Sequence, residues 1–241
     1  PEARRILGLF PSADVRLVKY QKSPFSSDVS QSQALLIGKK TLMIGETSSF
    51  VGRFDGRLGS NVRCCAYHKL VPVSNGCPYY CTYCYLAFVY RKFAPLIKIN
   101  VNYDAMFRQI RKALRGTARG KVSFNMGEML DSFALDHITN LTTMLVPFFA
   151  GFPRAYLMLL TKSSNIDNLL AVEPTGQAVA SWSLNSRKLS SDMRWAQPAS
   201  PSVSMPPCDA NSTAIESAFE SIRASFILVG KPDTPILSRR H

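Results

Sequence analysis

Three cysteines within eight residues, Cys77, Cys81 and Cys84, place the strongest constraint on this chain. Their Cys-x3-Cys-x2-Cys spacing puts three thiolates on one tight loop, directly after the turn signal Asn75-Gly76. Thiolate is the preferred protein ligand of iron–sulfur centres, so three thiolates can hold three irons of a [4Fe-4S] cluster. The fourth iron then lacks a protein ligand and can bind an exogenous molecule, which a catalytic metal centre requires.

A zinc site is the competing interpretation of the same loop. Structural zinc takes four ligands, and further candidates lie upstream at Cys64, Cys65 and His68. Cys65 precedes Cys77 by 12 residues, so a zinc site that combines them is possible. A disulfide framework is disfavoured, because the chain has no secretory signal pattern and three of its six cysteines are clustered. We therefore expect a metal or cluster site in a reducing compartment, and a cytoplasmic protein.

The composition predicts a globular chain without a membrane span. Hydrophobic residues make up 46% and charged residues 19% of the 241 residues, enough for one substantial core. The longest apolar run, around residues 143–152, is shorter than the roughly 18 residues that cross a bilayer. The sequence starts at Pro1 without an initiator methionine, which suggests a fragment or a processed product.

The positive charge of the chain is partly concentrated in one stretch. The formal net charge is +13, and the stretch from Arg91 to Lys121 holds nine basic residues against the single acid Asp104. A basic stripe of this kind attracts phosphate backbones through counterion release. A solvated helix face that aids solubility explains it equally well, so DNA is one candidate partner.

Strand and helix patterns alternate along the central part of the chain. Strand-like runs lie at residues 121–126, 155–160 and 178–184, and helical patterns lie at 103–114, 135–149 and 166–171. Repeating strand–helix units predict parallel strands with right-handed crossovers, in an open sheet or a barrel. Ligand chemistry is then expected at the carboxyl ends of the strands.

We expect three sections along the chain. Residues 1–62 suit a small α/β lead-in, residues 63–190 form the core, and residues 191–241 are irregular. In the lead-in we expect a helix at 2–10, strands at 14–20, 34–36 and 41–44, and a loop at 23–32. The last section is rich in proline and serine without a clear period, apart from weak patterns at 215–224 and 226–229. A shifted reading frame, and thus a non-native tail, is one hypothesis for it.

The cysteine spacing, with Tyr83 before the last cysteine and Tyr85 after it, resembles the radical S-adenosylmethionine (SAM) superfamily. Further segments resemble the spore photoproduct lyase family and occur in that family's order over roughly residues 4–190. They are Arg5–Leu7, Leu42–Gly45, Lys98–Val101, Leu135–Thr139, Leu160–Lys162 and Ser183–Asn185.

This resemblance implies a fold, a cofactor pair and a chemistry. The fold is a partial, incomplete TIM-type barrel, and the cofactors are a [4Fe-4S] cluster on Cys77, Cys81 and Cys84 together with SAM. Reductive cleavage of SAM gives a 5′-deoxyadenosyl radical that abstracts hydrogen from the substrate, and a flavodoxin or ferredoxin is the expected electron donor. The positions that match SAM contacts are Gly127, Glu128, Lys162, Ser183 and Asn185. Surface charges and turn residues are the alternative interpretation of these five.

In the family, two tyrosines beside the third cysteine relay hydrogen, and Tyr83 and Tyr85 match them. The family also uses a cysteine donor near the end of the second strand, where this chain has Glu128 and no cysteine follows Cys84 until Cys208. The resemblance therefore implies a radical SAM enzyme that acts in DNA photoproduct repair or on a related nucleic acid. The alternatives are a radical SAM protein with another kind of substrate and a zinc-containing nucleic-acid-binding module.

Overall fold

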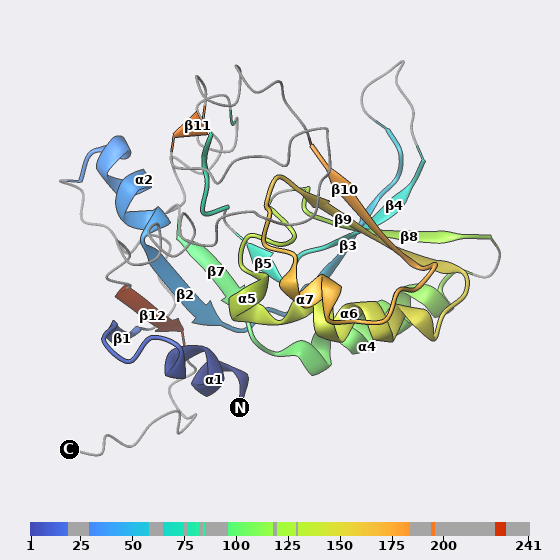
Figure 1. The fold of residues 1–241 in the computed structure, drawn as a ribbon, viewed down its shortest axis with the longest axis horizontal. Helices are drawn as coiled ribbons and strands as arrows, with labels where there is room; N and C mark the ends of the chain where they lie inside the picture. The colour runs from blue at the N-terminus through green and yellow to red at the C-terminus, as the bar shows by residue number, and fades with distance from the viewer. Residues whose placement is uncertain are drawn as a thin grey trace.

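The computed structural model describes residues 1–18, 29–57, 65–74, 77–81, 84, 96–117, 120–128, 130–183, 194–195 and 225–229. Within these residues the chain forms two five-stranded sheets, a two-stranded sheet and several helices (Figure 1). Most strand pairs in the two larger sheets are parallel. The predicted α/β class with parallel strands is therefore confirmed.

The first sheet has the strand order β1-β12-β2-β7-β5. Its strands are β1 (Asp14–Val18), β12 (Ser225–Val229), β2 (Thr41–Gly45), β7 (Ile97–Asn100) and β5 (Val73–Ser74). The first four run parallel to their neighbours, and β5 runs antiparallel to β7. Strand β12, from the section 191–241 that was expected to be irregular, thus lies between β1 and β2 of the lead-in. Strand β7 extends the same sheet.

The second sheet has the order β10-β9-β8-β4-β3 and carries the candidate site. Its strands are β10 (Ala178–Trp182), β9 (Ala155–Thr161), β8 (Val122–Met126), β4 (Tyr67–Leu70) and β3 (Val51–Phe54). The first four are parallel, and β3 is antiparallel to β4. In β8 and β9 buried residues alternate with half-buried ones, so one face packs on the core and the other is more open.

Helices lie beside both large sheets (Figure 1). Beside the first sheet are α1 (Glu2–Gly8) and α2 (Gln31–Lys39), and α2 packs against β2. Against the second sheet pack α4 (Tyr103–Arg115) and α6 (Leu141–Ala150), and α7 (Asp167–Leu170) packs against α6 and α5 (Asp136–Thr139). Met106 and Ile110 of α4 are fully buried, and Phe149 of α6 packs edge-on against Phe124 of β8 at 5.3 Å between ring centroids. No helix in these described ranges is long and apolar enough to cross a membrane.

The strand expected at residues 34–36 is wrong, because these residues belong to α2. A short apolar run fits a helix or a strand equally well, and a capping box decides between them. The side chain of Ser30 accepts a hydrogen bond from the Gln33 backbone, and the Gln33 side chain accepts one from the Ser30 backbone. The helix therefore begins where the sequence was expected to form a loop.

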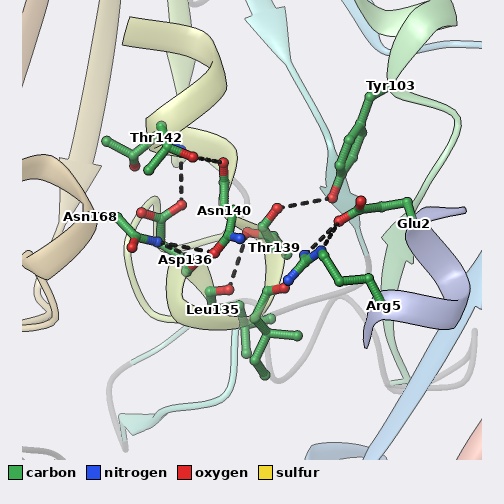
Figure 2. A network of polar contacts seen from close by, with 11 residues as sticks. Glu2, Arg5, Tyr103, Leu135, Asp136, Thr139, Asn140, Thr142 and Asn168 are labelled. Carbon is green, nitrogen blue, oxygen red and sulfur yellow. Dashed lines mark hydrogen bonds and ion pairs between the residues drawn. The ribbon is translucent and has the colours of Figure 1, made fainter. Parts of the chain in front are cut away.

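The single helix expected at residues 135–149 is instead two helices, α5 and α6. Asn140 lies between them with φ of 50°, a left-handed conformation that asparagine tolerates better than most residues. Around this break, Asp136 accepts a hydrogen bond from the Thr142 backbone at 2.9 Å (Figure 2). Asn168 of α7 donates to the backbone oxygen of Asp136 at 2.9 Å and to the side chain of Asn140 at 3.4 Å.

The first helix docks onto the same region. Figure 2 shows Arg5 of α1 paired with Glu2. The Arg5 guanidinium also donates to the backbone oxygen of Ile138. The hydroxyl of Tyr103 in α4 donates to the Thr139 backbone oxygen at 3.4 Å. The last carbonyl groups of a helix have no partner within it. At the end of α5, side chains from two other helices donate hydrogen bonds to these carbonyl groups.

Burial makes the Asp136 carboxyl a pH-dependent component of stability. Asp136 is only 2% exposed, and burial raises its pKa above the ordinary value of 3.8, although hydrogen bonds from Thr142 and Asn168 oppose the shift. Since the folded state keeps this proton at pH values where the unfolded chain has lost it, this contribution to stability falls as pH rises from 3.8.

We expect Asp136→Asn to remove this component, because an amide oxygen can still accept from the Thr142 backbone but does not ionise. Between pH 4 and pH 6 the free energy of unfolding of the variant should fall less than that of the wild type. Urea denaturation at several pH values measures this free energy. Asp167→Asn, at an exposed position, is the control. Equal pH dependence in all three proteins would contradict the prediction.

Candidate functional site

The carboxyl ends of β8, β9 and β10 bring together four of the residues that match SAM contacts. Gly127 and Glu128 follow β8, Lys162 follows β9 and Ser183 follows β10. Because the three strands are parallel neighbours, these ends lie at one edge of the sheet. The backbone of Ser183 continues the ladder by donating to the Thr161 oxygen at 2.9 Å.

Gly127 lies at the closest approach between two of these strand ends. Its φ is +117°, a region that residues with a side chain rarely adopt. A Cβ atom here would lie 2.5 Å from the backbone oxygen of Leu160 and 2.8 Å from Oγ of Ser132. Glycine is therefore required for the loop after β8 to turn against the end of β9.

Glu128 is held by two side chains of β4. Lys69 Nζ donates to its Oε1 at 2.7 Å, and the Tyr67 hydroxyl donates to its Oε2 at 3.0 Å. Both carboxylate oxygens are thus engaged, but a carboxylate has about four acceptor sites, so it can accept further bonds from a ligand. The Lys69–Glu128 pair is about one-third exposed on each side, so its main effect is to orient the carboxylate.

Tyr67 and Lys69 lie on the open face of β4, because side chains alternate along a strand. His68 between them lies on the core face and stacks on Phe124, with ring centroids 5.0 Å apart. Burial and the nearby positive charge of Arg53 lower the pKa of His68. His68, one of the upstream zinc candidates, is therefore engaged in core packing.

Asp131 is a residue of this edge that the sequence reasoning missed. It is 9% exposed, and its carboxylate accepts four hydrogen bonds of 2.6–3.1 Å, from Thr161 Oγ1 and from the backbone N–H groups of Lys162, Phe133 and Ala134. Burial raises its pKa, and these bonds oppose the shift. Asp131 therefore ties the loop after β8 to the end of β9 and fixes the backbone of Lys162. The local signal that could have indicated Asp131 is that aspartate commonly begins a turn.

The cysteine loop follows β5, a strand of the first sheet. Cys77 and Cys84 are half-buried, and Tyr80–Cys81 forms β6, which pairs antiparallel with β11 (Arg194–Trp195). Three thiols on one loop have the chemistry that an iron–sulfur cluster needs, so the donor set fits this group.

Some predictions at this loop cannot be compared with the structure. Among the side chains that the structure describes, no three His, Cys, Asp or Glu groups converge on one metal position, and the Cys81 side chain is not among them. Tyr83, Tyr85, Asn185 and Cys64 also lie outside the described residues. The three-thiol cluster site and the two tyrosine roles therefore stay predictions.

Comparisons with known proteins agree on one family. A sequence model of the family "Spore photoproduct lyase" matches residues 25–200. The chain is 29% identical over 149 residues to spore photoproduct lyase of Geobacillus sp., covering 62% of this chain and 41% of the relative. It is 22% identical over 194 residues to spore photoproduct lyase of Clostridium acetobutylicum, covering 78% of this chain and 54% of the relative. The chain thus spans about half the length of these curated relatives.

Solved structures with a similar fold include a spore photoproduct lyase mutant, with a TM-score of 0.66 and 20% identity over 95% of this chain and 64% of that chain. Another is a double mutant of spore photoproduct lyase with bound AdoMet and dinucleoside spore photoproduct. Its TM-score is 0.65, with 20% identity over 96% of this chain and 64% of that chain. The fold and the family match thus identify an α/β protein of the radical SAM class. More specifically, the chain belongs to the spore photoproduct lyase family, as the sequence resemblance indicated.

We expect Gly127→Ala to destabilise the protein by about 2 kcal/mol or more, because the added methyl group meets backbone atoms at a strained φ. Urea denaturation monitored by circular dichroism measures this loss. Gly8→Ala is the matched control: nothing lies within 4 Å of the added carbon, so the change should be neutral or slightly stabilising. Similar stabilities for the two variants would contradict the steric argument.

Proposed function

We propose that this chain is a radical SAM lyase that acts on a DNA photoproduct. The observation that carries the proposal is the family match over residues 25–200, which contains both the three-cysteine loop and the strand ends that follow β8, β9 and β10. In this proposal the two large sheets are parts of an incomplete TIM-type barrel. The expected flavodoxin or ferredoxin donor, the cytoplasmic location and the three-section domain division stay predictions.

The cofactors would be held at two places. Cys77, Cys81 and Cys84 would bind a [4Fe-4S] cluster, which with SAM supplies reductive cleavage and a hydrogen-abstracting radical when bound. At the strand ends, Glu128 would accept hydrogen bonds from the SAM ammonium group, and Lys162 would face its carboxylate. The turn at Gly127, which leaves no room for a side chain, brings the backbone of Glu128 to this edge.

The remaining site residues complete this arrangement. Ser183, which is exposed at the end of β10, and Asn185 would contribute further polar contacts to SAM. Tyr83 and Tyr85 would relay a hydrogen atom beside the third cluster cysteine, as the family resemblance implies. In this chain the hydrogen donor expected near the end of β8 is replaced by Glu128, which is bonded to Lys69 and Tyr67.

Glu128 also supports a second candidate function. A carboxylate cannot donate a hydrogen atom in the way that a thiol does, so reversal of a thymine dimer needs a donor from elsewhere. A radical SAM enzyme with a different substrate requires no cysteine at this position. Under this alternative the cluster and SAM sites are the same, and the substrate is not a nucleic acid.

We expect the anaerobically reconstituted protein to hold about four irons and to form 5′-deoxyadenosine when incubated with SAM and dithionite. Cys81→Ala should lose most of the iron and all of this product, since a cubane cluster with an open iron needs all three thiolates. Cys65→Ala, at an exposed thiol outside the motif, is the control and should retain both. Iron and sulfide content with chromatography of the product are the measurements. A colourless protein that holds zinc would favour the nucleic-acid-binding module instead.

The DNA partner is proposed on the exposed side of α4. Its residues Arg108, Arg111, Lys112 and Arg115 are exposed, and we call this set the α4 basic face. Tyr103, Met106 and Ile110 on the opposite side of the helix are buried, which fixes the orientation of the charges. Arg111 also lies over the Phe148 ring, 4.9 Å from its centroid.

Not every charge of the predicted stripe belongs to this face. Lys98 donates to the Glu46 backbone oxygen at 2.8 Å, and burial lowers its pKa. Arg91, Lys92 and Arg119 lie outside the described residues. Because α4 leads from the end of β7 to the start of β8, its last residues lie toward the amino ends of the strands. The α4 basic face would therefore hold the phosphates of flanking DNA and leave the strand ends to the lesion.

We expect replacement of the whole α4 basic face by glutamine to weaken DNA binding about tenfold or more at low salt. The slope of log affinity against log salt should become shallower by about 0.9 for each phosphate that the variant no longer neutralises. Fluorescence anisotropy with a labelled duplex measures both quantities. Arg4, Arg16 and Arg57, exposed elsewhere, replaced together by glutamine, form the control. A wild-type protein that binds no DNA at low salt would remove this part of the proposal.

A further inference from the structure

Lys39 connects the lead-in section to the cysteine loop. It is the last residue of α2, and its half-buried side chain reaches across to two backbone oxygens of the loop. Nζ donates to the backbone oxygen of Cys77 and, at 2.9 Å, to that of Tyr79. The contact joins residues about 40 positions apart in the sequence, so the helix holds the loop at the first cysteine of the motif.

The residue between these two carbonyl groups cannot donate a backbone hydrogen bond to either of them. Pro78, which lies between Cys77 and Tyr79, has no backbone N–H. A partly buried backbone oxygen needs a hydrogen-bond partner, and an ammonium group has three donors on one compact charged atom. A lysine can therefore satisfy both oxygens at once, and a charged donor forms stronger hydrogen bonds than a neutral one.

The charge of Lys39 matters as much as its hydrogen bonds. An iron–sulfur cluster gains one negative charge when it is reduced, and its potential depends on nearby charge and hydrogen bonding. A positive charge bonded to the backbone of the first cluster cysteine stabilises the more negative, reduced state. It therefore makes the cluster easier to reduce, and SAM cleavage requires a reduced cluster.

We propose that Lys39 is a positioning residue for the cluster: it fixes the backbone at Cys77 and raises the reduction potential through its charge. The inference rests on the proposed function, because it assumes that Cys77, Cys81 and Cys84 bind a [4Fe-4S] cluster. It assigns the first α/β section a direct part in the redox chemistry of the motif.

The test compares Lys39→Met with Lys40→Met, its exposed neighbour and matched control, and with Lys39→Arg, which keeps the charge. Each full chain is reconstituted anaerobically, assayed for iron and sulfide, and titrated with dithionite while the reduced cluster is followed by electron paramagnetic resonance. We expect the equilibrium constant for one-electron reduction to fall about tenfold in Lys39→Met, equivalent to about 59 mV. Lys40→Met and Lys39→Arg should remain close to the wild type.

The outcomes separate this inference from the proposed function. A wild-type protein without iron and sulfide removes the proposed function, and the role of Lys39 with it. A wild-type cluster whose potential is unchanged in Lys39→Met overturns the role of Lys39 alone. Where Lys39→Met holds no cluster, Lys39→Arg decides: a cluster with near wild-type potential supports the proposal. A Lys39→Arg protein that behaves like Lys39→Met overturns it.

Discussion

The close contact between the ends of β8 and β9 determines the geometry of the candidate site. Gly127 allows the loop after β8 to lie against the Leu160 backbone, and Asp131 then bonds the end of β9 from within that loop. The two strand ends are thereby held together, because breaking any one of the four hydrogen bonds to a buried carboxylate costs free energy. Glu128 and Lys162 owe their positions at a common edge to this contact.

Regular periodicity made much of the second sheet predictable. Alternation of apolar and polar residues indicated β8, a short apolar run indicated β9, and a single apolar stripe indicated α4, close to the bounds that the structure shows. Short segments were less informative. The helix at residues 34–36 depends on a capping box, and the break at Asn140 depends on one left-handed residue, so apolar pattern alone could not find either.

The site shows the same division. The motif spacing indicated the cysteines as candidates, and the resemblance to the family indicated Gly127, Glu128 and Lys162, because both signals are local in sequence. Their partners could not be predicted, because Tyr67 lies 61 positions and Lys69 59 positions from Glu128. These contacts form because β4 pairs with β8, and no residue pattern in β4 predicts this pairing. The sequence thus indicated which residues are candidates for the site and left open which side chains orient them.

The position of β12 has a consequence for how the protein folds during synthesis. This strand, at residues 225–229, lies between β1 and β2, and its Ser225 aligns with both Asp14 and Thr41. Strands β1 and β2 therefore cannot be joined through β12 until residues 225–229 have left the ribosome. Pairing across so long a sequence separation is intrinsically slow, so β1 and its neighbours are expected to remain exposed to chaperones longer than the second sheet.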